Sequence, residues 1–208
     1  MSFAQVYTRS VVGLHAPKVI IEVHLSQGLP ALTIVGLPEA AVRESKDRVR
    51  SAILNSGFQF PNRRLTINLA PADLPKDGAR LDLPIAIGIL AASDQLDPEV
   101  LSGFEFIGEL ALNGNLRQVT GSLAVARAIK AEALASKVLQ VANITEQELS
   151  EPQSKLPQLI VPIDNGAEAS RVDGVTILAA QSLKTVCDHL QSLANPSAAY
   201  ESLDVVQP

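Results

Sequence analysis

The side chains of this 208-residue chain that could do chemistry lie mainly in two charged stretches. In the first, residues 39–64, six cations accompany three carboxylates, a local net charge of +3 in a chain whose net charge is −5. Helical spacing places three of these cations on one face, opposite the apolar face. Such a face can neutralise phosphates, and its binding would weaken steeply with salt. The candidate DNA contacts are Arg43, Lys46, Arg50, Arg63 and Arg64.

The same charges also have a purely structural interpretation. Glu39 lies four residues before Arg43, and Glu44 lies four residues before Arg48. An acid placed four residues before a base stabilises an exposed helix. The sequence therefore leaves two alternatives open for this stretch, a DNA contact or a solvated helix face.

The second charged stretch, residues 73–82, contains Pro75 and Gly78 and is predicted to be a loop. Its arginine has carboxylates nearby in the loop and on the strand that follows. Ion pairs with them would lock the loop, whereas unpaired charges would form a contact surface for another protein. The candidate interface residues are Lys76, Asp77, Arg80, Asp82 and Glu109.

Several classes of site have no signature in this sequence. No phosphate-binding loop of the form Gly-x-x-x-x-Gly-Lys-Ser/Thr occurs. His15, His24 and His189 are not at metal-ligand spacing from one another or from the single cysteine. That cysteine, Cys187, lies in an apolar helical stretch and is expected to be a buried thiol. We therefore expect no catalysis, no cofactor and no metal in this chain.

Composition is typical of an intracellular globular domain. Hydrophobic residues make up 47% of the chain and aromatic residues 3%, so the core must be aliphatic and a base-stacking platform is not expected. A single cysteine excludes a disulfide framework, and the first residues lack the features of a secretion signal. The longest apolar run, residues 83–92, is half of the ~20 residues that a membrane span needs. We expect a cytoplasmic protein with no membrane partner.

The elements that must position these residues follow from periodicity and turn residues. Strands are predicted over 3–12, 18–25, 32–35, 65–69, 104–112, 116–119, 159–161 and 175–178, with a hairpin turn at Asn113-Gly114. Helices are predicted over 39–55, 83–93, 122–135 and 181–193. Gly57 is expected to terminate the first helix, and Asp82 to cap the second, which is apolar all round and should be buried. The fold class is therefore α/β or α+β with a mixed sheet.

Two stretches fit this pattern poorly. Residues 136–157 contain a possible strand at Lys137–Val141, and Pro152 and Pro157 then interrupt the pattern, so we expect an insertion or an extended loop. Residues 195–208 are a polar tail with too few apolar residues for an element of their own. We expect one domain over residues 1–194, followed by this tail.

Three segments carry a resemblance to a bacterial protein family. They are Val35–Ser45, Asn68–Gly78, and Phe104–Leu112 with the following Gly114. Over about residues 1–194 the chain resembles the N-terminal domain of the ComM/YifB-type, Mg-chelatase-like AAA+ proteins. That domain is similar in turn to the proteolytic domain of Lon peptidases, which has the ribosomal protein S5 domain 2-like fold. The resemblance implies this fold, with helices packed on a mixed sheet.

The resemblance also implies that peptidase chemistry has been lost. Residues 75–78, Pro-Lys-Asp-Gly, match the Lon segment that precedes the nucleophilic serine, and the position of that serine falls on Arg80. The position of the general-base lysine falls on Leu123. An arginine stays protonated and a leucine transfers no proton, so neither half of the dyad remains. Because Ser122 has no lysine in register, a cryptic serine peptidase is the least favoured hypothesis.

In the family that this chain resembles, an AAA+ ATPase module with its ATP and Mg²⁺ follows the domain. The resemblance implies a homo-hexameric ring that processes DNA, as a helicase or branch-migration motor, during natural transformation. We therefore expect a non-catalytic accessory domain whose partners are its own AAA+ module, neighbouring subunits and DNA. The alternative is a stand-alone nucleic-acid-binding domain that uses the basic surface of residues 43–64.

Overall fold

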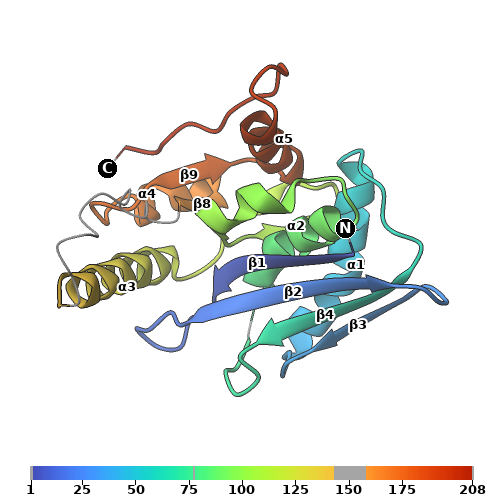
Figure 1. Cartoon of the computed structure of the whole chain (residues 1–208), viewed down its shortest axis with the longest axis horizontal. Helices are drawn as coiled ribbons and strands as arrows, with labels where there is room; N and C mark the ends of the chain where they lie inside the picture. The colour runs from blue at the N-terminus through green and yellow to red at the C-terminus, as the bar shows by residue number, and fades with distance from the viewer. Residues whose placement is uncertain (1, 77, 143–157, 208) are drawn as a thin grey trace.

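The computed structural model describes residues 2–76, 78–142 and 158–207, and for residues 136–142 it describes the backbone course only. Its main feature is a seven-stranded sheet with the order β3-β4-β2-β1-β5-β8-β9 (Figure 1). The strands are β1 (Phe3–Arg9), β2 (Lys18–Ser26), β3 (Ala31–Val35), β4 (Arg64–Ala70), β5 (Phe104–Phe106), β8 (Gln158–Pro162) and β9 (Ile177–Ala180), and a separate pair is formed by β6 (Glu109–Leu110) and β7 (Leu116–Arg117). In the large sheet, β2 runs antiparallel to β1 and β4, and the other neighbours are parallel. The predicted mixed α/β class is confirmed.

Helices pack on this sheet and build the aliphatic core. They are α1 (Ala40–Asn55), α2 (Asp82–Ala92), α3 (Ser122–Ala142), α4 (Gly166–Ala169) and α5 (Leu183–Ala194), with short 3-10 helices at Ala79–Leu81, Pro98–Gly103 and Ile163–Asn165. Every residue of α2 is buried, as its uniformly apolar sequence predicted. It packs so closely on the sheet that a Cβ atom at Gly88 would lie 2.7 Å from Cγ2 of Val23.

Helix α1 connects β3 to the parallel strand β4 and matches its predicted span closely. Its buried side chains, including Val42, Val49 and Ile53, recur at helical spacing. Gly57 follows the helix with φ +85°, as a terminating glycine should. Gly36, just after β3, has φ +93°, and a Cβ atom there would lie 2.1 Å from the backbone oxygen of Leu69. Only glycine fits at this close approach between neighbouring strands.

The prediction of one continuous strand over residues 104–112 was wrong. The chain forms β5, breaks at Gly108, and then forms β6 in the separate hairpin. Gly108 donates its N–H to the carbonyl of Arg80 (2.9 Å) and accepts the N–H of Leu83 (3.0 Å), so its backbone bonds to the start of α2 and the 3-10 helix before it instead of the large sheet. The predicted hairpin turn at Asn113-Gly114 is confirmed, with φ +87° at the glycine.

Helix α3 is longer than predicted. It continues to Ala142 through Lys137–Val141, where a strand was considered, so residues 136–142 are helical rather than an inserted loop. The reason is local: residues 122–142 contain no glycine or proline and many alanines, which favour a helix. Residues 143–157, the remainder of the expected insertion, lie outside the described residues.

Several strand boundaries also differ from prediction, and β7 ends at Arg117 rather than at residue 119. Strand β1 ends at Arg9 rather than at residue 12, because the chain turns back at Gly13 (φ +61°) through a bridge between Val12 and His15. Strand β9 begins at Ile177, two residues later than predicted.

The C-terminal tail forms no named helix or strand among its described residues, but it returns to the sheet. Val205 forms an isolated antiparallel bridge with β9, and the Val206 N–H donates to a β9 carbonyl (2.9 Å). Nearer α5, Nδ1 of His189 accepts the N–H of Leu203 (3.1 Å), and burial lowers the pKa of this histidine. The tail therefore lies along the outer edge of β9.

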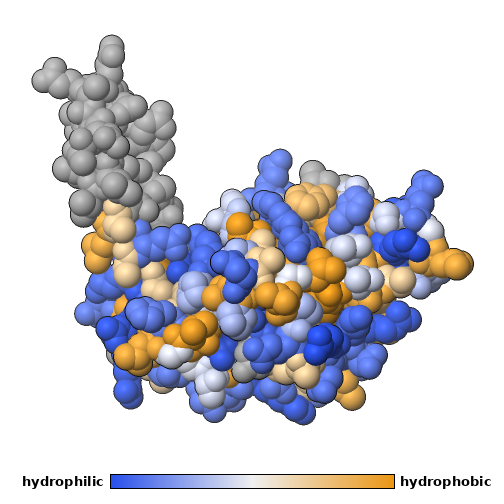
Figure 2. Space-filling view, turned by 90° about the horizontal axis from the view of Figure 1, so that it is seen from below, coloured by the Kyte–Doolittle hydropathy of each residue, from blue (hydrophilic) through white to orange (hydrophobic). Residues whose placement is uncertain are grey.

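The face of the molecule that is seen from below has both hydrophilic and apolar residues (Figure 2). Seen from below, hydrophilic residues surround scattered apolar ones (Figure 2). Within residues 2–142 and 158–207, apart from residue 77, no helix is both long and apolar enough to cross a membrane. Helices α1 and α3 lie toward opposite ends of the molecule (Figure 1).

Candidate functional site

The two positions at which the resemblance to Lon peptidases places a catalytic dyad lie on contacting segments, the 3-10 helix before α2 and the segment that leads into α3. Nη1 of Arg80 donates to the carbonyl oxygen of Thr120 (2.9 Å), two residues before the start of α3. Gly121 lies against the same guanidinium, since a Cβ atom there would be 3.6 Å from Nη1 of Arg80. Leu123 is the second residue of α3. A guanidinium held by the backbone and an aliphatic side chain therefore stand where the resemblance expects a nucleophile and a base, and that assignment stays a prediction.

Ser122, the neighbouring hydroxyl, is fully buried and held by two side chains. Its Oγ donates to Oε2 of Glu168 (2.5 Å) and accepts from Nδ2 of Asn165 (3.3 Å). Lys130, the nearest lysine along α3, is eight residues away, about 12 Å along the helix axis. The Ser122 hydroxyl thus links the start of α3 to α4 and is not placed to attack a substrate.

Asp82 does not cap α2 as predicted. The N-cap position is Leu81, and the Asp82 carboxylate instead receives Nε and Nη2 of Arg48 (2.7 and 3.1 Å) and the N–H of Leu110 (3.2 Å). Complete burial raises the pKa of Asp82 to about 6, although the pairing with Arg48 acts in the opposite direction. This ion pair joins α1 to α2 and the hairpin, so Asp82 is structural and inaccessible to a partner.

Lys76 is also inside the fold. Its side chain is fully buried and its Nζ donates to the carbonyl of Pro71, and burial lowers its pKa while Asp73 partly offsets this effect. The backbone of the loop is attached at both sides, because Ser10 Oγ donates to the Pro75 carbonyl (2.7 Å) and Glu39 donates its N–H to the carbonyl of Lys76 (3.2 Å). Burial removes Lys76 from any contact surface of this loop.

The remaining members of the candidate interface are more exposed. Glu109 pairs with Arg117 across the small hairpin (3.3 Å), with the arginine side chain 63% exposed. Asp77 lies outside the described residues. The interface interpretation of this loop therefore depends on Arg80 and Glu109, and it stays a prediction.

The candidate DNA contacts on and after α1 are spread out rather than clustered. Because β3 and β4 are parallel, the start of α1 lies near the carboxyl end of β3 and its end lies near the amino end of β4. Arg43 belongs to the first turn, whereas Arg63 and Arg64 follow the helix, and residues 43–55 alone span about 18 Å. One end of this surface therefore carries a single arginine and the other end a pair.

Several cations of this surface already have partners within the fold. Lys46 donates Nζ to the carbonyl of Leu32 (2.9 Å), and the Arg50 guanidinium lies 4.8 Å from the centroid of the Phe60 ring. Arg48 turns away from Glu44 to pair with Asp82. Arg43, Arg63 and Arg64 are exposed. The alternative of a solvated, partly structural face is thereby strengthened, and a DNA contact here stays a prediction.

The structure offers no metal chemistry in the residues it describes, where no three His, Cys, Asp or Glu side chains form a group suited to an ion. Cys187 is fully buried, as predicted, and burial raises the pKa of its thiol. His15 and His24 are exposed, and His189 holds the tail.

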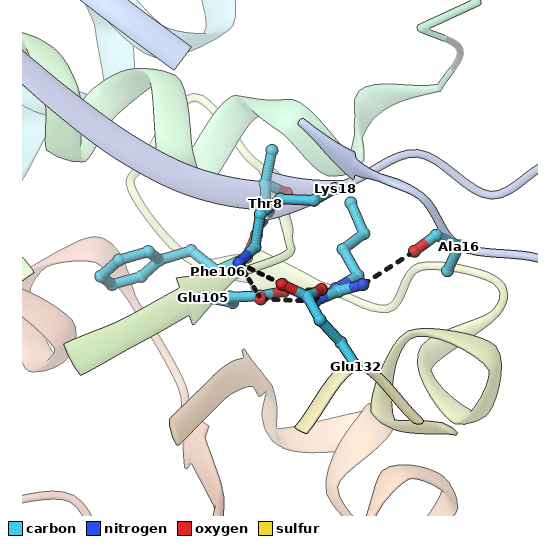
Figure 3. Close-up of polar contacts among 7 residues, drawn as sticks. Thr8, Ala16, Lys18, Glu105, Phe106 and Glu132 are labelled. Carbon is cyan, nitrogen blue, oxygen red and sulfur yellow. Dashed lines mark hydrogen bonds and ion pairs between the residues drawn. The ribbon is translucent and has the colours of Figure 1, made fainter. Parts of the chain in front are cut away.

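Sequence reasoning missed a buried ion cluster, called here the Arg9 cluster and shown in Figure 3. Nε and Nη2 of Arg9 donate to the two oxygens of Glu105 (2.7 and 2.8 Å), and Nη2 also donates to Glu132 (2.5 Å). Lys18 pairs with Glu132 (2.8 Å) and approaches Glu105 (3.8 Å). The cluster fixes α3 to β1, β2 and β5. One feature of the sequence could have indicated this cluster. Glu105 is a single charged residue between two phenylalanines in a predicted strand, and a charge in such a place needs a buried partner.

Comparison with known proteins places these observations in a family. Residues 21–143, more than half of the chain, match the family model described as Subunit ChlI of Mg-chelatase. Uncharacterized protein YifB of Salmonella typhimurium is 44% identical, and the match covers 99% of this chain and 38% of the relative. Uncharacterized protein YifB of Escherichia coli is 46% identical, and the match covers 92% of this chain and 33% of the relative. Competence protein ComM of Haemophilus influenzae is 64% identical over 58% of this chain and 24% of its own length. The chain thus spans less than two fifths of these relatives.

Proposed function

Because this chain belongs to the family of Mg-chelatase subunit ChlI, as an N-terminal region of the YifB and ComM type, we propose that it is a non-catalytic accessory domain of an AAA+ ATPase that processes DNA. The observation that carries the proposal is the pair of residues at the expected dyad. Arg80 is bound to the backbone just before α3, and Leu123 is the second residue of that helix. Neither side chain can act as a nucleophile or a general base.

The longer protein would supply the chemistry that this chain lacks. An ATPase module would bind ATP and Mg²⁺ and assemble as a homo-hexamer in the cytoplasm. This domain would help the ring to assemble or to engage DNA. The name of the Haemophilus relative, Competence protein ComM, supports natural transformation as the setting.

The two alternative functions have weaker support. A stand-alone nucleic-acid-binding domain would depend on the surface of residues 43–64, where Lys46 and Arg50 already have partners within the fold. A serine peptidase would depend on Ser122, which is fully buried and hydrogen-bonded to Glu168 and Asn165.

The proposal is tested in a full-length protein that carries this chain, compared with a version that lacks it. We expect the shortened protein to retain basal ATP hydrolysis but to lose hexamer formation or DNA-stimulated hydrolysis by about tenfold, a coupling of roughly 1.4 kcal/mol. Light scattering after gel filtration reports assembly, and a coupled assay reports hydrolysis. Unchanged assembly and unchanged DNA stimulation would refute an accessory role. Turnover of casein by this chain that disappears in Ser122→Ala would refute the non-catalytic assignment.

A further inference from the structure

A groove of about 380 Å³ lies between α3 and the turn that follows α4, away from every candidate DNA contact of α1. Its charged lining consists of Arg127, Lys130 and Arg171 with one carboxylate, Asp173, and its apolar lining includes Leu123 and Leu134. The groove therefore carries a local net charge of +2 on a chain whose net charge is −5. The groove is therefore positive although the chain as a whole is negative.

The three cations of the groove have no side-chain partners among the described residues. Within the described part of the chain, none of them forms an ion pair or a hydrogen bond with another side chain. Arg127 and Arg171 are exposed. They differ in this respect from Lys46, Arg48 and Arg50, whose head groups all have partners within the fold.

The walls of the groove are fixed relative to one another. Ser122 at the start of α3 bonds to Glu168 and Asn165, which belong to α4 and the turn before it. Further along α3, Glu132 is held by Arg9 and Lys18 of the sheet. Arg127 and Lys130 lie between these two anchors, one helical turn apart, and Arg171 lines the same groove from the turn after α4. Such preorganisation lowers the entropic cost of binding.

We infer that this groove binds the phosphodiester backbone of DNA, an inference that rests on the proposed function and names the surface that would perform it. Three cations on walls that the fold holds in place, with one carboxylate among them, match a row of phosphates. Among the described residues, the lining contains no aromatic side chain, so bases do not stack there and the contact is independent of sequence. The aliphatic residues pack against the sugar edge of the strand.

The test uses the full 208-residue chain and a fluorescently labelled forked DNA, titrated by anisotropy between about 50 mM and 200 mM salt. In the groove variant, Arg127→Glu and Lys130→Glu are combined. The control variant combines Arg43→Glu and Arg63→Glu, which makes the same change in net charge on the other surface. Arg171→Gln, on a turn outside α3, is a second groove variant that leaves the helix sequence intact.

We expect the groove variant to bind at least about tenfold more weakly, with a salt dependence lower by about one unit per lost phosphate contact, and the control to bind like the parent chain. Arg171→Gln should weaken binding in the same direction. If the parent chain binds DNA and only the control loses binding, the groove inference is wrong while the proposed function stands. If the parent chain binds no DNA even at low salt, the groove inference and DNA engagement by this domain both fall. Binding of labelled poly-L-glutamate without DNA binding would likewise overturn the inference, in favour of an acidic protein segment.

Discussion

Replacing Glu105 with glutamine probes an ion pair that is almost fully buried. The side chains of Arg9 and Glu105 are 4% and 1% exposed, and two hydrogen bonds of 2.7 and 2.8 Å join them. Burial disfavours the charge of Arg9, but the bonds to Glu105 and Glu132 outweigh this effect, so the pKa of Arg9 is raised. The substitution keeps the size of the side chain and removes one of two negative charges that balance two cations.

The expected loss of stability follows from burial. Removing one partner of a buried ion pair costs roughly 3–5 kcal/mol because the other charge stays buried without compensation. Glutamine retains one acceptor oxygen, so we expect about 3 kcal/mol, which lowers the melting temperature by about 6–12 °C in a chain of this size. Glu132 contacts the same guanidinium, but its side chain is 46% exposed. For Glu132→Gln we therefore expect at most about 1 kcal/mol.

The measurement is urea unfolding followed by far-ultraviolet circular dichroism, since the chain has no tryptophan. Linear extrapolation gives the free energy of unfolding, and an unchanged slope shows that the same surface is exposed in each variant. A double variant, Arg9→Met with Glu105→Leu, removes both charges and should be nearly as stable as the parent chain.

Two results would refute this reasoning. A loss below about 1 kcal/mol for Glu105→Gln would show that solvent reaches the cluster and screens it. Equal losses for Glu105→Gln and Glu132→Gln would show that burial does not set the cost of breaking these bonds.

Four further predictions concern single sites. Arg48→Met should cost roughly 3–5 kcal/mol in urea unfolding, because it leaves Asp82 buried without its partner. Asp82 has a pKa of about 6 in the folded state and 3.8 in the unfolded state, so the folded state binds more protons between pH 3.8 and about 6. The free energy of unfolding should therefore fall as the pH rises through this range. Asp82→Asn should flatten that slope, and an unaltered profile would contradict the assignment. Gly36→Ala should lower the free energy of unfolding by more than the roughly 1–3 kcal/mol of backbone strain alone, because its methyl group would meet the Leu69 carbonyl. A loss under about 1 kcal/mol in thermal unfolding would disprove the close approach. His189 has a lowered pKa when folded, so its contribution to stability should decline as pH falls below about 6.5, and His189→Gln should remove that decline in melting temperature. A decline of the same size in the variant would assign it to another group.

Features that depend on neighbouring residues could be predicted from the sequence. The uniformly apolar stretch of α2 was correctly predicted to be buried, and Gly57 and the Asn113-Gly114 turn were correctly placed. Each rests on a short-range rule of periodicity or backbone conformation. The same kind of rule failed at residues 104–112, because the backbone of Gly108 bonds to a segment more than twenty residues earlier.

The candidate site was harder to predict, because its charged side chains pair with residues that are far away in the sequence. For Arg48 the sequence offered Glu44, four residues away, whereas the structure pairs it with Asp82, 34 residues away. Arg9 and Glu105 are 96 residues apart, and no sequence period relates them. In the same way, Arg171 joins Arg127 and Lys130 only through the packing of α4 against α3.

The return of the tail to β9 has a consequence for how the protein behaves in solution. A strand at the edge of a sheet presents unpaired backbone groups that recruit strands from other molecules, and β9 is an aliphatic edge strand, Ile-Leu-Ala-Ala. Val205 and Val206 occupy part of that edge, and His189 secures the tail that carries them. We expect a fragment that ends at residue 194 to expose the edge of β9 and to aggregate through it. By covering part of this edge, the tail protects the protein from such association.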